Sequence, residues 1–166
     1  MRREKVEQTA LEIHSVLNSQ IFRDKVLVMQ KHGERSAWRN KSNKEIYDFI
    51  MKGSERLSPE VDYEMDVFID DYYSIKRVIG YTNGKTPYIF TNTRYFDKNH
   101  TREVGANIVH EWSHKLGFDH DFRATAARPY SVSYRLGKIY QECYDIIFKK
   151  QLAAIIDGDT VVMATA

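Results

Sequence analysis

The spacing of hydrophobic and polar residues along the chain predicts a mixture of helices and strands. Hydrophobic residues recur every three or four positions in four segments, where we expect amphipathic helices: residues 3–19, 44–53, 102–116 and 133–150. Short hydrophobic or alternating runs predict strands over residues 25–30, 61–70, 74–81 and 86–93. Elements in this order are typical of an α+β fold.

Capping residues set the expected ends of two of these helices. Ser42 or Asn43 can cap the helix over 44–53, and Gly53 can end it. Thr101 is the expected N-cap of the third helix, which Gly117 ends because glycine readily adopts the left-handed conformation of a helix terminus.

A hairpin is expected between the last two strands. Asn83-Gly84 is a strong short-range turn signal, so residues 74–81 and 86–93 should pair with each other. Pro87 cannot donate a backbone hydrogen bond, which favours an edge position for the strand over residues 86–93.

Composition adds few constraints on function. A chain of 166 residues suggests a single domain over residues 1–166, in which residues 151–166 form a helix end and a strand or a partly ordered tail. The net charge of +2 gives no reason to expect nucleic acid or a membrane as partner, and we expect a monomer. No apolar run is long enough to span a membrane, and no signal peptide is visible. Cys143 is the only cysteine, so no internal disulfide can form. The sequence is compatible with a cytoplasmic protein and with a secreted protein from which the signal was removed.

The richest stretch in the sequence is HEWSHKLGFDH, residues 110–120, which contains three of the six histidines. His110 and His114 are four positions apart, so on a helix their rings share one face and can bind one metal ion. Gly117 allows a sharp turn that brings His120 back as a third ligand. Three protein ligands leave a fourth position open, which is typical of a catalytic zinc site. Glu111 is placed to accept a proton from a water at that position.

Other ligands are conceivable. Asp119 or Asp121 could replace His120 or orient a ligand histidine, and Glu142 could be the third ligand of a glutamate-type site. The remaining histidines have no partner at ligand spacing, and we expect them on the surface: His14, His32 and His100.

The stretch at 110–120 resembles the HExxHxxGxxH motif of the metzincin branch of zincin metallopeptidases. The resemblance is specific over residues 103–120. It implies a small twisted sheet with an exposed edge strand, an active-site helix and a backing C-terminal helix. It also implies that the three histidines bind zinc and that Glu111 is the general base.

One departure from that family concerns the methionine turn beneath the metal. The chain has no methionine between Met65 and Met163, and residues 128–137 fall where the turn would lie. In some metzincins a tyrosine after the methionine reaches the metal or the oxyanion; Tyr134 matches it best, with Tyr130 second.

The expected activity is therefore zinc-dependent cleavage of peptide bonds. Glu111 would take a proton from the attacking water and return it to the leaving amine, and Tyr134 would help to stabilise the oxyanion. We expect the peptide or protein substrate to bind extended along the edge strand over residues 86–93.

Two other functions stay open. HxxxHxxGFDH also resembles the HGxxHxxGYDH motif of the bacterial rRNA-maturation endoribonucleases, small metal-binding α+β proteins, but that family has glycine where this chain has Glu111. The third alternative is a metal-bound binding module without catalytic activity.

Overall fold

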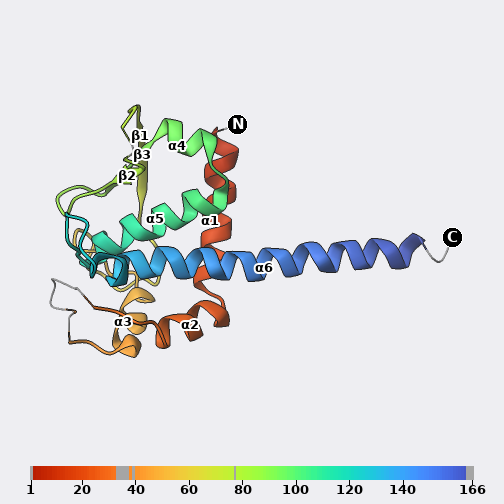
Figure 1. The fold of residues 1–166 in the computed structure, drawn as a ribbon, viewed down its shortest axis with the longest axis horizontal. Coiled ribbons are helices and arrows are strands. Elements are labelled where there is room, and N and C mark those ends of the chain that lie inside the picture. Colours follow the sequence, from red (N-terminus) through yellow and green to blue (C-terminus); the bar gives the residue numbers. More distant parts are fainter. Residues whose placement is uncertain (1, 33–37, 39, 77, 164–166) are drawn as a thin grey trace.

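The computed structural model describes residues 2–32, 38, 40–76 and 78–163, which form a mixed fold of helices around a small sheet (Figure 1). This confirms an α+β fold at the coarse level. The elements in chain order are α1 (Arg2–Leu17), α2 (Gln20–Leu27), α3 (Asn43–Ile50), β1 (Phe68–Tyr72), β2 (Gly80–Tyr81), β3 (Tyr88–Asn92), α4 (Thr93–Lys98), α5 (Thr101–Leu116), the 3₁₀ helix η1 (Arg128–Tyr130) and α6 (Val132–Met163).

Helix α5 lies at the centre of the fold. It packs against α1 and α6 and also contacts β2 and β3, so each of its faces meets a different element (Figure 1). The core side chains on α5 are Val104, Ala106, Ile108, Val109, Trp112 and Leu116. Among the described residues, no helix combines the length and the apolar character needed to cross a membrane.

The three strands are arranged in the order β1-β3-β2, with β1 parallel and β2 antiparallel to β3. The prediction that residues 86–93 form an edge strand is therefore wrong, because β3 is paired on both sides. Pro87 lies just before β3, which begins at Tyr88, so its missing N–H does not interrupt the ladder. The edge next to α5 is β2 instead.

The other strand predictions were too long or wrong. The predicted strand over residues 25–30 is wrong, because helix α2 continues to Leu27. Ser19 caps the start of this helix by accepting a hydrogen bond from the Phe22 N–H. Phe22 and Val26, four residues apart, are both fully buried, as on one face of a helix. The strand predicted over residues 61–70 forms only as β1, which begins at Phe68. The strand predicted over residues 74–81 forms only as the two-residue β2.

The capping predictions are confirmed for the start of α3 and for the end of α5, whereas the prediction that Gly53 ends α3 is wrong because the C-cap is Met51. Ser42 and Glu45 form a reciprocal capping box at the start of α3. This helix ends at Ile50, and Gly53 follows with φ 61°. The N-cap of α5 is His100 rather than Thr101, and its side chain makes no capping hydrogen bond.

Helix α6 is much longer than predicted and continues to Met163, so the predicted end at residue 150 is wrong. Its N-terminal part lies along α5, and its C-terminal part projects from the rest of the molecule (Figure 1). Of the two alternatives for residues 151–166, the strand does not form up to residue 163, and residues 164–166 lie outside the described residues.

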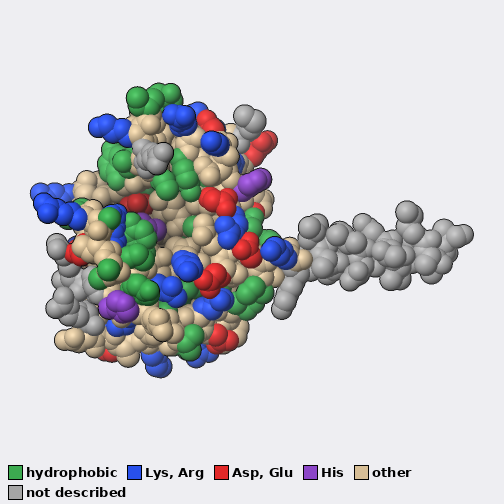
Figure 2. Space-filling view, viewed as in Figure 1, with side chains coloured by type: hydrophobic (Ala, Val, Ile, Leu, Met, Phe, Trp, Pro, Cys, Tyr) green, Lys and Arg blue, Asp and Glu red, His purple; other side chains and the backbone are tan. Residues whose placement is uncertain are grey.

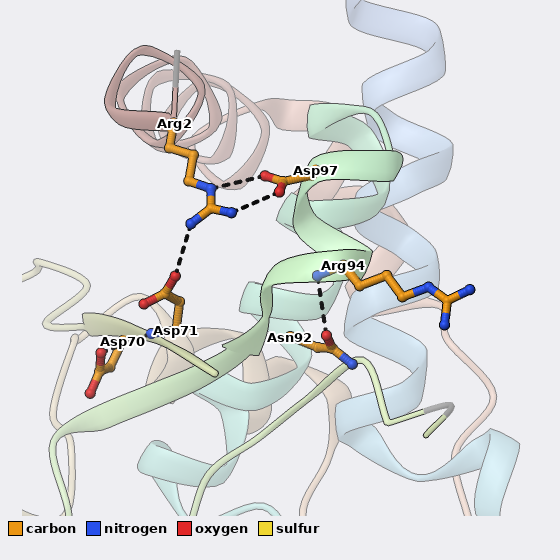
Figure 3. A network of polar contacts seen from close by, with 6 residues as sticks. All are labelled: Arg2, Asp70, Asp71, Asn92, Arg94 and Asp97. Carbon is orange, nitrogen blue, oxygen red and sulfur yellow. Dashed lines mark hydrogen bonds and ion pairs between the residues drawn. The ribbon is translucent and has the colours of Figure 1, made fainter. Parts of the chain in front are cut away.

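An ion-pair bridge fixes the start of the chain to the sheet. The Arg2 guanidinium donates two hydrogen bonds to Asp97 of α4, at 2.8 and 3.1 Å, and one to Asp71 of β1 at 3.2 Å (Figure 3). Asn92 caps α4 by accepting from the Arg94 N–H, and its amide donates to the carbonyls of Ser74 and Val78. These contacts tie α1, α4 and the β1–β2 connection together.

Candidate metal centre

Three histidines converge at the C-terminal end of α5. One ring nitrogen each from His110, His114 and His120 lies within 4.8 Å of the other two. His110 and His114 belong to α5, and their rings meet edge to face at a centroid distance of 5.1 Å. His120 comes from the segment after the helix, so the structure brings together the three residues that the sequence predicts as ligands.

The turn at Gly117 makes this convergence possible. Gly117 has φ 99°, a left-handed conformation that side chains rarely adopt. A Cβ there would also lie 2.7 Å from Nε of Arg56, whose guanidinium donates to the Gly117 carbonyl. Phe118 is fully buried directly after the turn, which anchors the chain before it returns with His120.

Each histidine ring is oriented by a backbone carbonyl. Nδ1 of His114 lies 2.7 Å from the Phe118 oxygen, and Nδ1 of His120 lies 3.0 Å from the Asp121 oxygen. His110 is hydrogen-bonded to the backbone of Ser133. A carbonyl oxygen can only accept, so the contacts of His114 and His120 place the proton of each ring on Nδ1 and leave the Nε2 lone pair available for a metal.

The distance between two of these lone pairs fits a shared metal ion. Nε2 of His110 lies 3.3 Å from Nε2 of His120. Because the His120 proton is on Nδ1, Nε2 of His120 directs its lone pair toward Nε2 of His110. Two nitrogens bound tetrahedrally to zinc at roughly 2.0–2.1 Å lie about 3.3 Å apart. The donor set of three neutral imidazoles therefore fits zinc.

The environment keeps these rings neutral. Burial, together with the neighbouring His114 and His120, lowers the pKa of His110 to about 3, against the Ser133 hydrogen bond, which raises it. Burial also lowers the pKa of His114 and of His120. A neutral imidazole is the form that binds metal.

Glu111 lies on the same helix and is 7% exposed. Burial raises the pKa of its carboxyl to about 7, against the charge of Lys115 and a backbone hydrogen bond from Thr82, which both lower it. A buried carboxyl group whose pKa lies near 7 is suited to general-base chemistry near neutral pH.

Lys115, whose charge lowers the pKa of Glu111, is hydrogen-bonded to the hairpin between β2 and β3. Its buried ammonium donates hydrogen bonds to the carbonyls of Asn83 and Thr86, on the two sides of the hairpin turn. Sequence reasoning missed both Lys115 and Thr82. Lys115 is four residues after Glu111 and so shares its helix face, which was the available signal; nothing in the sequence pointed to Thr82.

Tyr134, at the start of α6, lies against the histidine cluster. Its ring centroid lies 4.6 Å from that of His110 and 4.9 Å from that of His120, and the Arg128 guanidinium lies over the ring at 5.0 Å. Tyr130, the second candidate, stacks instead on His32 at 4.3 Å. The structure thus brings Tyr134, not Tyr130, against the rings of His110 and His120.

The alternative ligands take other positions. Glu142 forms an ion pair with Lys25 of α2 at 2.7 Å, and it is not among the residues that converge. Oδ1 of Asp119 lies 3.9 Å from Nδ1 of His114, on the side of the ring that faces away from the cluster. Asp121 contributes its backbone carbonyl to His120 and its carboxylate to the Thr125 hydroxyl. The three other histidines are exposed, as predicted: His14, His32 and His100.

No family model, no curated protein and no solved structure matches this chain. The function is therefore inferred from the geometry of the centre and from the resemblance of its motif.

Proposed function

We propose that the chain is a zinc-dependent metalloendopeptidase. The observation that carries this proposal is the convergence of His110, His114 and His120, with the buried carboxyl of Glu111 on the same helix. Zinc bound by these three rings supplies a Lewis acid that polarises a carbonyl and lowers the pKa of water.

The other groups of the centre have separate tasks in this proposal. Glu111 accepts the proton of the attacking water and passes it to the leaving amine. The Tyr134 hydroxyl donates a hydrogen bond to the oxyanion that develops on the scissile carbonyl. The backbone carbonyl of Ser133 accepts a hydrogen bond from the His110 ring and supports that ligand. Ser133 lies in the segment where metzincins carry their methionine turn.

The substrate binds as an extended strand along β2 rather than along β3. β2 is the free edge of the sheet beside α5, and Thr82, the residue after it, hydrogen-bonds Glu111 through its backbone. An edge strand offers unpaired N–H and C=O groups to a peptide. A peptide there lies next to the general base.

The test compares wild type with Glu111→Gln, which retains the size and shape of the side chain but cannot accept the proton. With zinc supplied, wild type should cleave unfolded casein, and the variant should bind zinc equally well while losing at least about 100-fold in kcat. Glu142→Gln is the matched control, because Glu142 is paired with Lys25 away from the centre, and it should keep full activity.

The rival functions predict different results in the same experiment. Zinc-dependent cleavage of ribosomal RNA without peptide cleavage would replace the peptidase by the endoribonuclease. Tight zinc binding without cleavage of either polymer would identify the inactive binding module. Equal casein cleavage by wild type and Glu111→Gln would overturn the mechanism.

A further inference from the structure

The outer face of the sheet carries a continuous row of aromatic rings. Consecutive centroid distances along the row are 5.7, 6.2, 4.9 and 5.2 Å. We call this surface the aromatic face, and its residues in order are Phe68, Tyr88, Phe90, Tyr81 and Tyr72. Strand register places all five side chains on the same side, because Phe68 pairs with Tyr88 and Phe90 pairs with Tyr81.

Where β1 and β3 begin, the two sides of the sheet differ in burial. On the inner side, Ile89 and Thr91 of the central strand are 0% and 2% exposed. On the aromatic face, Phe68 is 58% exposed and Tyr88 is 42% exposed. Figure 2 shows hydrophobic side chains gathered over the part of the molecule where Figure 1 places the sheet, above a hollow in which acidic and histidine side chains are visible. Exposed aromatic surface of this extent is typical of an interaction site.

A single carboxylate lies within this row. Asp70 alternates with Phe68 and Tyr72 along β1, and it pairs in register with Phe90. Its neighbour Asp71 points to the other side of the sheet, where Arg2 neutralises it at 3.2 Å (Figure 3). No Lys or Arg among the described residues forms an ion pair with Asp70, which Figure 3 shows pointing away from Arg2.

We propose that the aromatic face binds an extended peptide segment in which a lysine or arginine side chain is flanked by apolar side chains. The apolar side chains pack on the exposed rings, and the cation lies over a ring beside Asp70, where cation–π attraction and the carboxylate act together. A nucleic acid could also stack its bases on such rings, but its phosphates would be repelled by Asp70. The charge therefore favours a basic peptide.

The aromatic face is continuous with the candidate metal centre. Tyr81 directly precedes Thr82, whose backbone hydrogen-bonds Glu111. Burial is the main cause of the raised pKa of Tyr72, and Tyr81 and the charge of Glu111 raise it further. A segment bound on the aromatic face thus continues toward the edge of β2. The inference that these segments belong to substrates rests on the proposed peptidase function, whereas the binding itself does not.

The experiment measures binding separately from cleavage by using the full chain with Glu111→Gln, so that no bound peptide is cut. Fluorescence anisotropy is recorded with three labelled probes: a leucine-rich peptide with one central arginine, the same peptide with glutamate in that position, and single-stranded oligouridine. The arginine peptide should bind about tenfold more tightly than the glutamate peptide, as expected for a cation–π contact combined with an exposed ion pair. Asp70→Asn should weaken its binding about three- to tenfold on the same grounds.

Matched variants separate the aromatic face from a general effect of charge or apolar surface. Asp71→Asn removes the neighbouring charge on the other side and should leave peptide affinity unchanged. Tyr88→Ala should weaken both peptides, whereas Leu11→Ala, an exposed apolar residue of α1, should weaken neither. Circular dichroism verifies that each variant is folded.

Several results would overturn the proposal. It is wrong if the arginine and glutamate peptides bind with equal affinity, or if Asp70→Asn and Asp71→Asn change the affinity equally. It is also wrong if oligouridine binds more tightly than either peptide and Tyr88→Ala weakens that binding. Binding is measured without turnover, so the two proposals can fail separately. If the arginine peptide does not bind but the active protein still cleaves casein, only the proposed binding to the aromatic face is refuted. Docking with no cleavage would refute only the proposed peptidase.

Discussion

Gly105 of α5 lies in direct contact with the Tyr140 ring of α6. A Cβ at position 105 would lie 2.4 Å from the Tyr140 hydroxyl oxygen, and Tyr140 is fully buried. The two helices also lie close together at Gly137, where a Cβ would lie 3.0 Å from the Ala106 carbonyl oxygen. Gly137 is one turn after Tyr134, so this close crossing also brings Tyr134 against the histidines.

Gly105→Ala should therefore destabilise the protein, although alanine is the better helix former. Overpacking of a filled core costs about 1–3 kcal/mol, which exceeds the gain of about 1 kcal/mol in helix propensity. Urea unfolding followed by circular dichroism measures the change. Gly84→Ala is the control, because the nearest neighbour of its Cβ would lie 3.7 Å away, and its free energy of unfolding should change little.

A second substitution checks the cause of that loss. Tyr140→Phe removes the oxygen that meets the new methyl group, and this hydroxyl has no hydrogen-bond partner to lose among the described residues. The double variant Gly105→Ala/Tyr140→Phe should regain part of the lost stability. If the two effects simply add, the clash with Tyr140 is not the cause.

Zinc should stabilise the folded chain through the histidine centre. A ligand that binds only the folded state adds about 2.7 kcal/mol at 100 times its Kd, which corresponds to a rise in Tm of roughly 5–10 °C for a domain of this size. His120→Ala should abolish most of this shift in differential scanning fluorimetry. His14→Ala, an exposed histidine of α1, should keep it, and a shift that survives in His120→Ala would show that zinc binds elsewhere.

The histidine centre could be predicted because its information is local. The helical spacing of His110 and His114, the turn at Gly117 and the return of His120 all lie within eleven residues, and the structure confirms each of them. The contact of Tyr134 with the rings spans more of the chain and depends on the close crossing of α5 and α6. It was predicted through the family resemblance, because spacing alone gave no signal for it.

The sheet was harder to predict because strand order depends on contacts far apart in sequence. β3 pairs in parallel with β1, which is separated from it in sequence by residues 73–87, including β2. No local pattern at Pro87 distinguishes a proline in an edge strand from one just before a central strand. Likewise, Lys25 to Leu27 have strand-like composition, but the burial of Phe22 and Val26 on one side favours a helix.

The pair of Glu55 and Trp112 should make stability depend on pH. The Trp112 indole N–H donates to Glu55, whose other carboxylate oxygen is buried without a partner among the described residues. Burial raises the pKa of Glu55 above its usual value, and this outweighs the hydrogen bonds from Trp112 and Asp66. The folded state thus binds this proton more tightly than the unfolded state, so Glu55 favours folding most below about pH 4.5 and progressively less as pH rises through its folded pKa.

Glu55→Gln removes this titration while retaining an acceptor for Trp112. Relative to wild type, the variant should therefore gain stability as pH rises from 4.5 to 8, measured by urea unfolding followed through tryptophan fluorescence. Glu60→Gln, an exposed carboxyl group, should show no such trend. A stability difference between Glu55→Gln and wild type that falls with rising pH would reverse the sign and refute the assignment.

Tyr134→Phe separates a role in catalysis from a role in packing. The substitution keeps the ring that contacts His110 and His120 and removes only the hydroxyl, which makes no hydrogen bond to another described residue. If the hydroxyl stabilises the oxyanion, kcat on a fluorogenic peptide should fall roughly 10- to 100-fold while KM and zinc affinity stay near the wild-type values. Tyr130→Phe, on the ring that stacks against His32, should keep the wild-type kcat. Unchanged kcat in Tyr134→Phe would assign Tyr134 to packing, and an equal loss in both variants would point to a general disturbance of the segment before α6.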